Sequence, residues 1–302
     1  NEREAVKVLE KAQQQARLEK KLLRALVPTA VSERLARGDA LIADSYCDAT
    51  VLFIYVCDYT AMVLQHDTGP SIEWINRILA RLDDAITHAP KSLTKVETFN
   101  NFLLVFSGVR DDAPGPPTGT GTRTLPGPGP ANLKSSGTGC AHAEMCLGLA
   151  LSMLHAVKEV ERPDGKPTTL KVGLNSGPLA AGVIGSGSPR YSIFGDTVNT
   201  GSRMASSSLP CSFASPFIHM TQATYQRLDA SFTAELGSMM RLQLAPRGEG
   251  MEIKGKGTMQ TFSLHPLPAD PPPLAASAAE PALFGCGGEE GLVLELPGRR
   301  RG

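Results

Sequence analysis

The chain has 302 residues, with 30 basic and 30 acidic side chains and a formal net charge of zero. This balance gives no electrostatic basis for binding nucleic acid or an anionic membrane surface, so both are excluded as main partners. The 30 Gly and 23 Pro are concentrated in an insertion at 111–139 and in a tail at 266–302, which we predict to be disordered. Removing both segments leaves one core of ordinary domain size.

The cysteines and the apolar runs predict an intracellular chain. No CxxC pair occurs, and two of the six cysteines lie within apolar runs, where a thiol packs like a small hydrophobic group. No apolar run reaches the roughly 18 to 20 residues needed to cross a bilayer, and no secretory leader is visible. Because the sequence begins at Asn1, we interpret it as a fragment. We expect a cytoplasmic-side location, with any membrane tether in an upstream receptor region missing from the fragment.

Residues 1–28 predict a short coiled coil. Apolar side chains recur on a seven-residue repeat that Glu19 interrupts, and Pro28 ends the pattern. The repeat consists of Ala5, Leu9, Ala12, Ala16, Leu23 and Leu26. A single amphipathic helix packed on its own domain is the alternative interpretation.

Residues 29–265 predict an α/β (α+β) domain. The helix over 71–89 is amphipathic, with Ser71 as its N-cap, and Asn100-Asn101 joins two strands through a tight turn. The order strand, helix, hairpin, helix, strand is that of a ferredoxin-like βαββαβ sheet with helices on one face. In chain order, the predicted elements are a helix at 30–37, a strand at 50–56, a helix at 71–89, strands at 94–99 and 102–108, a helix at 141–160, strands at 170–177, 180–186 and 190–195, a helix from 197, a strand at 217–220, a helix at 221–228 and a strand pair ending at 264.

The densest group of candidate site residues lies in SPRYSIFGDTVNTGSRM, at 188–204. Gly195 and Asp196 mark a strand-to-helix turn, and Asn199 and Arg203 are four residues apart on the helix that follows, so they share one face. An amide and a guanidinium presented together can hold a sugar oxygen and a phosphoryl group in a transition state. An exposed polar helix face is the alternative.

Several segments in the same order resemble the catalytic domain of the class III nucleotide cyclases, most closely the guanylyl cyclases. They are 188–204, KVETFNNFLLVFSG at 95–108, LKVGLNSGPLAAGVIG at 170–185 and EIKGKGTMQTFSL at 252–264. The resemblance implies that two such domains pair head to tail, with each active site between them. One partner supplies two aspartates that hold two metal ions, and the other supplies the residues that recognise the base, the transition state and the triphosphate. The predicted coiled coil is similar to the signalling helix that precedes such domains.

The resemblance assigns substrate-binding roles to several residues of this chain. Asn199 and Arg203 match the family's ribose-orienting and transition-state pair, and Glu97 matches the glutamate that recognises guanine in guanylyl cyclases. A carboxylate accepts hydrogen bonds from guanine N1 and N2, whereas adenine N1 is an acceptor, so Glu97 favours GTP. Ser192 occupies the second base position, where its hydroxyl can donate to guanine O6 but can also accept. Lys254 matches the triphosphate-binding lysine.

Two questions about these assignments stay open. Lys256 is close enough to Lys254 in KGKG to be the triphosphate ligand in its place. At the two metal positions of the family, Tyr55 and Asn101 stand where aspartates are expected. Hard dications prefer charged oxygen ligands, which a phenol and an amide do not supply. Asp58 is a disfavoured substitute, because its offset from Tyr55 would turn its side chain to the other face of a continuing strand.

These residues together predict a guanylyl cyclase subunit that acts in a heterodimer. This chain would recognise GTP, and a second cyclase domain would hold the two Mg²⁺ or Mn²⁺ ions, with cyclic GMP and pyrophosphate as the products. A homodimer would lack metal ligands in both sites and is predicted to be inactive. The alternatives are a catalytically inactive pseudo-cyclase that regulates by dimerising and, disfavoured by Glu97, an adenylyl-type subunit.

Overall fold

The computed structural model describes residues 11, 14–15, 27–39, 41–110, 141–185 and 189–268. The insertion, almost all of the coiled coil and almost all of the tail therefore lie outside the described residues, and the expectations for them stay predictions. None of the helices in the described ranges combines the length and the apolar character needed to cross a membrane.

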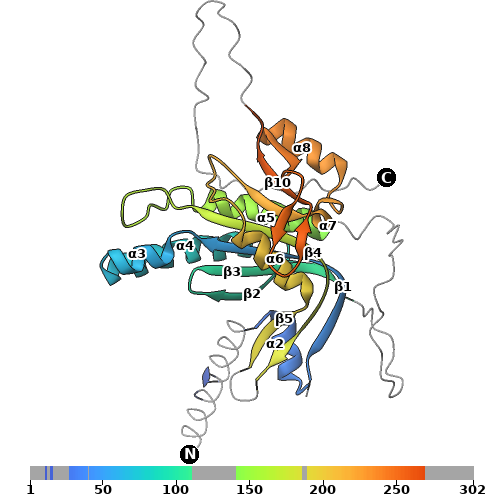
Figure 1. The fold of residues 1–302 in the computed structure, drawn as a ribbon. Helices are drawn as coiled ribbons and strands as arrows, with labels where there is room; N and C mark the ends of the chain where they lie inside the picture. Colours follow the sequence, from blue (N-terminus) through green and yellow to red (C-terminus); the bar gives the residue numbers. More distant parts are fainter. Residues whose placement is uncertain are drawn as a thin grey trace, which may run out of the picture.

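The described chain is a mixed α and β structure (Figure 1). Its elements are α2 (Thr29–Ala36), β1 (Ala43–Val56), α3 (Tyr59–Gln65), α4 (Thr68–His88), β2 (Thr94–Phe99), β3 (Phe102–Arg110), α5 (Ala141–Ala156), β4 (Leu170–Ile184), β5 (Arg190–Phe194), α6 (Asp196–Ser206), β6 (Ile218–Thr221), α7 (Gln222–Tyr225), α8 (Ala230–Met240), β7 (Leu242–Pro246), β8 (Met251–Ile253), β9 (Gly257–Met259) and β10 (Thr261–Pro266).

The central sheet has the order β2-β3-β1-β4-β6-β10-β7, with β5 paired to β4. The first four strands of this order are antiparallel neighbours, with β1 between β3 and β4. That arrangement is the predicted ferredoxin-like βαββαβ core, so the predicted fold class is confirmed. Beyond it, β6 lies parallel to β4 and extends the sheet toward the C-terminal strands. A separate two-stranded sheet is formed by β8 and β9.

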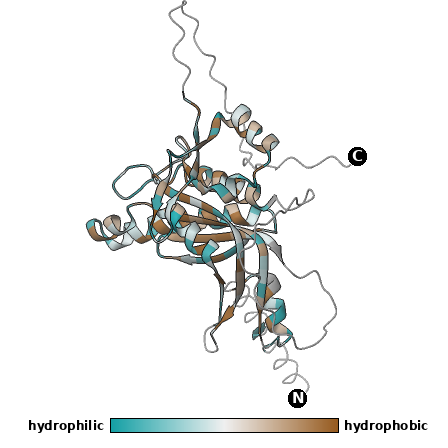
Figure 2. Ribbon diagram, turned by 45° about the vertical axis from the view of Figure 1, so that its right-hand side comes forward, coloured by the Kyte–Doolittle hydropathy of each residue, from teal (hydrophilic) through white to brown (hydrophobic). Residues whose placement is uncertain are grey.

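The main core lies between the sheet and the pair α4 and α5. One face of α4 is buried, including the fully covered Trp74 and Ile78, as its amphipathic pattern predicts. The indole Nε1 of Trp74 donates to Thr168 Oγ1 at 2.9 Å, which satisfies its polar atom in the interior. The hydrophobic residues follow the central strands (Figure 2). Each buried aliphatic side chain contributes about 1.5 to 3 kcal/mol to folding.

The opposite face of the sheet is covered in part by α6. Helix and sheet approach each other closely at Gly173 of β4, where an added Cβ would lie 2.0 Å from the backbone nitrogen of Ala205. They approach again at Gly201 of α6, where an added Cβ would lie 2.5 Å from Val51 Cγ2 and 3.2 Å from the Phe53 ring. The glycines therefore set the distance between α6 and strands β1 and β4.

Two strands are longer than the sequence predicts. The first half of β1 mixes exposed and buried residues, so only its second half shows the continuous apolar run that predicts a buried strand. The segments predicted as separate strands at 170–177 and 180–186 form one strand, β4. Pro178 lies opposite the register shift between Tyr46 and Ala49 of β1. Its missing N–H therefore falls where the ladder is already interrupted, which allows the strand to continue.

Three helices also differ from the predictions. The helices α3 and α8 were not predicted, and α4 begins at Thr68, before the predicted start. Ser71 is therefore not the N-cap: it lies inside α4, and its hydroxyl donates to the Met62 carbonyl of α3 at 3.2 Å. Ser71 instead connects two successive helices.

Candidate functional site

The α6 helix begins at a glycine turn, as predicted. Gly195 has φ 131°, in the region that favours glycine, and its carbonyl accepts from the backbone N–H of Val198 at 3.2 Å. The next turn of the helix carries Asn199, which is exposed, and the following turn carries Arg203, which is half-buried. The two side chains predicted to act together therefore project from successive turns of one helix.

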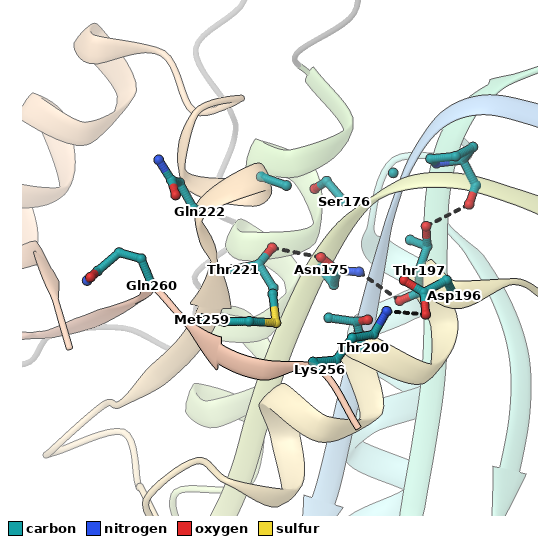
Figure 3. Close-up of a pocket in the computed structure, with 13 residues that line it drawn as sticks. Asn175, Ser176, Asp196, Thr197, Thr200, Thr221, Gln222, Lys256, Met259 and Gln260 are labelled. Carbon is teal, nitrogen blue, oxygen red and sulfur yellow. Dashed lines mark hydrogen bonds and ion pairs between the residues drawn. The ribbon is translucent and has the colours of Figure 1, made fainter. Parts of the chain in front are cut away.

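Buried hydrogen bonds fix the first turn of α6 on the sheet (Figure 3). The Asn175 amide of β4 donates to the Thr197 carbonyl at 2.9 Å, and the Thr221 hydroxyl of β6 donates to Asn175 Oδ1 at 2.7 Å. The Thr197 hydroxyl donates to the Pro178 carbonyl at 2.6 Å. The side chains of Asn175, Thr197 and Thr221 are buried, and an unpaired polar atom in the interior costs about 1 to 3 kcal/mol. The start of α6 is thereby held to two strands.

The two predicted base-recognising residues lie on strands that contact each other. Glu97 is exposed on β2, just after a register shift that separates it from Lys95. Ser192 is half-buried on β5, opposite Gly182 of β4. The strands β2 and β5 are in contact, and β5 also contacts α6. The structure therefore gathers the elements that carry Glu97, Ser192, Asn199 and Arg203 at one side of the sheet.

The two lysines of the β8–β9 turn have different environments. Lys256 forms an ion pair with Asp196 at the start of α6, a contact visible in Figure 3. Lys254 is exposed and makes no ion pair with any other residue that the structure describes. Between them, a Cβ added to Gly255 would lie 3.5 Å from Arg203 Nη1. The turn thus lies against the Arg203 guanidinium, with Lys256 paired and Lys254 exposed.

The positions of Tyr55 and Asn101 are adjacent in the structure. Asn101 follows Asn100, whose φ of 50° forms the predicted tight turn between β2 and β3. The Val56 N–H donates to the Asn101 carbonyl at 2.7 Å, and the Asn101 amide donates to the Val56 carbonyl at 3.1 Å. The Tyr55 hydroxyl lies 3.0 Å from Ser202 Oγ on α6. Both side chains are therefore engaged in contacts within the chain.

These side chains do not fit a site for two divalent cations. Neither supplies a carboxylate, and the nearby Asp58 accepts a hydrogen bond from Arg162 Nη1 at 2.6 Å. Asp58 has φ 55° and lies after the end of β1, where its carboxylate pairs with the loop that follows α5. Within the described ranges, no cluster of three or more His, Cys, Asp and Glu side chains is arranged to hold a metal ion. Mg²⁺ in proteins is normally bound through one or two carboxylates.

A buried row of hydrogen-bonded polar groups, which no sequence motif predicts, crosses the sheet behind this region. His142 Nδ1 lies 2.7 Å from Thr50 Oγ1, and Thr50 Oγ1 lies 2.7 Å from Ser176 Oγ. The Ser176 hydroxyl donates to Thr224 Oγ1 at 3.0 Å, and Thr224 Oγ1 lies 3.3 Å from Thr221 Oγ1. This row of polar groups thus reaches Thr221, which helps to fix α6 through Asn175.

At the His142 end, this row of polar groups meets an ionic group formed by Asp48 and Arg227. Arg227 Nε donates to Asp48 Oδ1 at 2.9 Å, and His142 Nε2 lies 3.3 Å from Asp48 Oδ2. Burial raises the pKa of Asp48, but contact with His142 and the charge of Arg227 outweigh burial, so the pKa lies below its usual value. The Asp48 carboxylate is therefore ionised at neutral pH.

His219 of β6 also contacts α6. Its Nδ1 lies 2.9 Å from the Met204 carbonyl, which assigns the proton to Nδ1 because a carbonyl only accepts. Burial lowers the pKa of His219 to about 4, since its fully covered ring cannot easily carry a charge. His219 is therefore a neutral donor that holds the carbonyl of the residue after Arg203.

A cavity of about 460 Å³ opens beside the start of α6 (Figure 3). Its walls come from β4, α6, the β6–α7 junction and the segment from β9 to β10, and the Lys256–Asp196 ion pair belongs to its lining. Asn175 and Thr221 in its wall are hydrogen-bonded to each other. No local pattern predicts this cavity, because its residues come from separate segments, although most of them lie within the stretches at 170–185, 188–204 and 252–264 that carry the family resemblance.

The chain matches the adenylate and guanylate cyclase catalytic domain over residues 41–266. Among curated proteins, it is 32% identical over 250 residues to the receptor-type guanylate cyclase gcy-28 of Caenorhabditis elegans, covering 80% of this chain and 16% of that protein. It is 31% identical over 245 residues to the human guanylate cyclase soluble subunit beta-2, covering 80% of this chain and 33% of that protein. The chain therefore spans a third or less of the length of these two relatives.

Solved structures agree with these sequence relationships. The guanylate cyclase domain of RhGC from Catenaria anguillulae in complex with GTP superimposes with a TM-score of 0.54 at 26% identity, covering 73% of this chain and 97% of that domain. A bacterial light-regulated adenylyl cyclase superimposes with a TM-score of 0.57 at 10% identity, covering 85% of this chain and 63% of that one, which supports the fold alone. The fold and these matches define a class III nucleotide cyclase domain. The chain belongs to the family of adenylate and guanylate cyclase catalytic domains.

Proposed function

We propose that this domain supplies the GTP-recognising half of a heterodimeric guanylyl cyclase site, which forms cyclic GMP and pyrophosphate. The observation that carries the proposal is the placement of Arg203 against the β8–β9 turn, with Asn199 one turn earlier on α6. The named guanylate cyclases among its relatives, and the GTP complex of a similar domain, support this choice of substrate.

Each residue has a distinct proposed task. Glu97 accepts hydrogen bonds from guanine N1 and N2, and Ser192 donates to O6. Asn199 orients the ribose so that its 3′-oxygen faces the α-phosphorus. Arg203 stabilises the charge that develops on the phosphoryl oxygens, and Lys254 binds the triphosphate as a point charge. Lys256 has a structural task instead, because it is paired with Asp196.

The metal ions are proposed to belong to a second cyclase domain. Its two aspartates hold two Mg²⁺ or Mn²⁺ ions, which activate the attacking oxygen and neutralise the phosphates when bound. This chain contributes Tyr55 and Asn101 at the corresponding positions, and both are already engaged with Ser202 and Val56. A homodimer would therefore lack carboxylate ligands in both sites and would have negligible activity.

A regulatory pseudo-cyclase is the second candidate function. The contact between Tyr55 and Ser202 favours it, because it engages a side chain without a carboxylate at one of the two metal positions. In that case, the domain would control a partner by dimerising. In either case, we propose that residues 29–265 form the cyclase domain on the cytoplasmic side of the cell, that residues 1–28 act as a coiled-coil signalling helix, and that 111–139 and 266–302 are disordered.

Nucleotide selectivity in a mixture tests the proposal. The chain is mixed with a cyclase domain that carries both aspartates, and product formation is compared for GTP and ATP. We expect cyclic GMP to be the main product. The double substitution Glu97→Lys with Ser192→Asp is expected to shift the preference toward ATP, because it reverses the hydrogen-bond polarity of the base site. Ser206→Ala, at the exposed end of α6, is the matched control. Unchanged selectivity in this double variant would contradict the assignment of Glu97 and Ser192 as the base-recognising residues.

A further inference from the structure

The ring of Tyr55 is fixed between two other aromatic residues. Its ring centroid lies 6.5 Å from that of Phe53, in a stacked arrangement, and 5.8 Å from that of Phe102. The residue is half-buried at the end of β1. Ring packing therefore determines the direction of the phenol, so that its hydroxyl points from the strand toward α6.

The hydroxyl contacts α6 between the two proposed catalytic side chains. Tyr55 Oη lies 3.0 Å from Ser202 Oγ, and Ser202 follows Asn199 by three residues and precedes Arg203. The neighbouring Gly201 packs against Val51 and Phe53 of β1, since a Cβ added to it would lie 2.5 Å from Val51 Cγ2. The contact therefore reaches the helix where a small rotation would move both Asn199 and Arg203.

Other contacts hold α6 elsewhere along its length. Asn175 holds the carbonyl of Thr197 in the first turn, and His219 holds the carbonyl of Met204 near the end. Both of these bonds end on backbone atoms. The bond from Tyr55 ends on a side chain of the middle turn, so it restrains the rotation of that turn about the helix axis.

We propose that Tyr55 is a positioning residue, whose hydroxyl holds the middle turn of α6 at the rotation that the transition state requires. The proposal rests on the function proposed above, because it presumes that Asn199 and Arg203 act on a nucleotide. Tyr55 thus has a task different from metal binding at the position where the family resemblance places an aspartate. It acts through α6 and does not touch the substrate.

Three variants isolate the hydroxyl contact. Tyr55→Phe removes the hydroxyl but keeps the ring between Phe53 and Phe102, and Ser202→Ala removes the other end of the bond. The double variant tests whether the two changes act through one contact. Tyr59→Phe is the matched control, since it removes a phenol hydroxyl from a half-buried tyrosine of α3 that packs on the main core.

Hydrogen exchange in the chain alone gives a readout that needs no activity. Removing one hydrogen bond is expected to speed the exchange of the amides in α6 by about fivefold, in Tyr55→Phe, in Ser202→Ala and to the same extent in the double variant. Tyr59→Phe is expected to leave α6 unchanged. Exchange in α6 that is equal for wild type and Tyr55→Phe would overturn the proposal, whether or not the chain is an enzyme.

Kinetics in the mixture separate positioning from a merely structural contact. We expect kcat to fall by about tenfold in each single variant, with KM for GTP unchanged, because misplacement affects the transition state more than ground-state binding. The double variant is expected to show the same kcat as the single ones. Faster exchange with an unchanged kcat would reduce Tyr55 to a structural role. If the wild-type mixture forms no cyclic GMP, the proposed function fails, and with it the catalytic role of Tyr55, while the exchange result still decides the anchoring contact.

Discussion

The close approach of α6 to β4 at Gly173 makes the position of the helix sensitive to one methyl group. In Gly173→Ala, the new Cβ would lie 2.0 Å from the backbone nitrogen of Ala205, whereas a van der Waals contact needs about 3.5 Å. The helix or the strand must therefore move by about 1.5 Å. Overpacking that side chains can relieve costs about 1 to 3 kcal/mol. Because a backbone atom blocks the methyl group here, we expect the free energy of unfolding to fall by at least about 3 kcal/mol.

The same displacement should also affect catalysis, because α6 carries Asn199 and Arg203. A misplacement of about 1 Å can lower a rate by about 100-fold, so we expect at least that loss of cyclase activity in the mixture with an aspartate-bearing domain. Urea denaturation of the chain alone measures the stability.

Gly237→Ala is the matched control for this substitution. Outside its own helix, the Cβ that it adds to α8 would meet only the Leu242 carbonyl oxygen at 3.6 Å, an ordinary contact distance, and the change should stabilise the chain by up to about 1 kcal/mol. Gly173→Ala with wild-type stability and activity would refute the argument that this contact sets the helix position.

Two further predictions concern His219 and the lysines of the β8–β9 turn. The pKa of His219 is lowered from 6.5 to about 4, so between these values only the unfolded state takes up the proton. The free energy of unfolding should therefore fall by about 1.4 kcal/mol for each unit by which the pH drops below 6.5. Denaturation of wild type and His219→Gln at several pH values measures this component, and equal pH dependence would contradict it. Lys254→Ala should lower kcat/KM for GTP in the mixture by at least about tenfold, because it removes a charge on the triphosphate. Lys256→Ala should lower kcat/KM for GTP less. It should cost at most about 1 kcal/mol of stability, because its ion-pair partner Asp196 is exposed. A larger kinetic effect of Lys256→Ala than of Lys254→Ala would assign triphosphate binding to Lys256.

The sequence predicts well those features whose signal is local. The amphipathic pattern locates α4, and the order of strands and helices indicates the ferredoxin-like core. The turn at Gly195 and the spacing of Asn199 and Arg203 place both side chains on one helix. Each of these signals lies within a window of a few residues, where periodicity and turn chemistry act directly.

The features that escaped prediction depend on residues far apart in the chain. Tyr55 and Ser202 are separated by 147 residues, and Thr50 and Ser176 by 126. Their contacts arise only once β1, β4 and α6 have packed together. Nor does any local pattern show that Arg162 engages Asp58. A single sequence therefore identifies the side chains available for chemistry better than the contacts that hold them in place.

The central claim is that this chain supplies the half of a cyclase site that recognises the nucleotide. It is tested most directly by mixing it with a cyclase domain that keeps both metal-binding aspartates but lacks its own Asn and Arg pair. Neither protein alone should convert GTP to cyclic GMP with Mg²⁺ or Mn²⁺, whereas the mixture should, and Asn199→Ala or Arg203→Ala should abolish the product. Cyclic GMP formed by this chain alone and lost on Arg203→Ala, or a mixture no more active than its parts, would contradict the account.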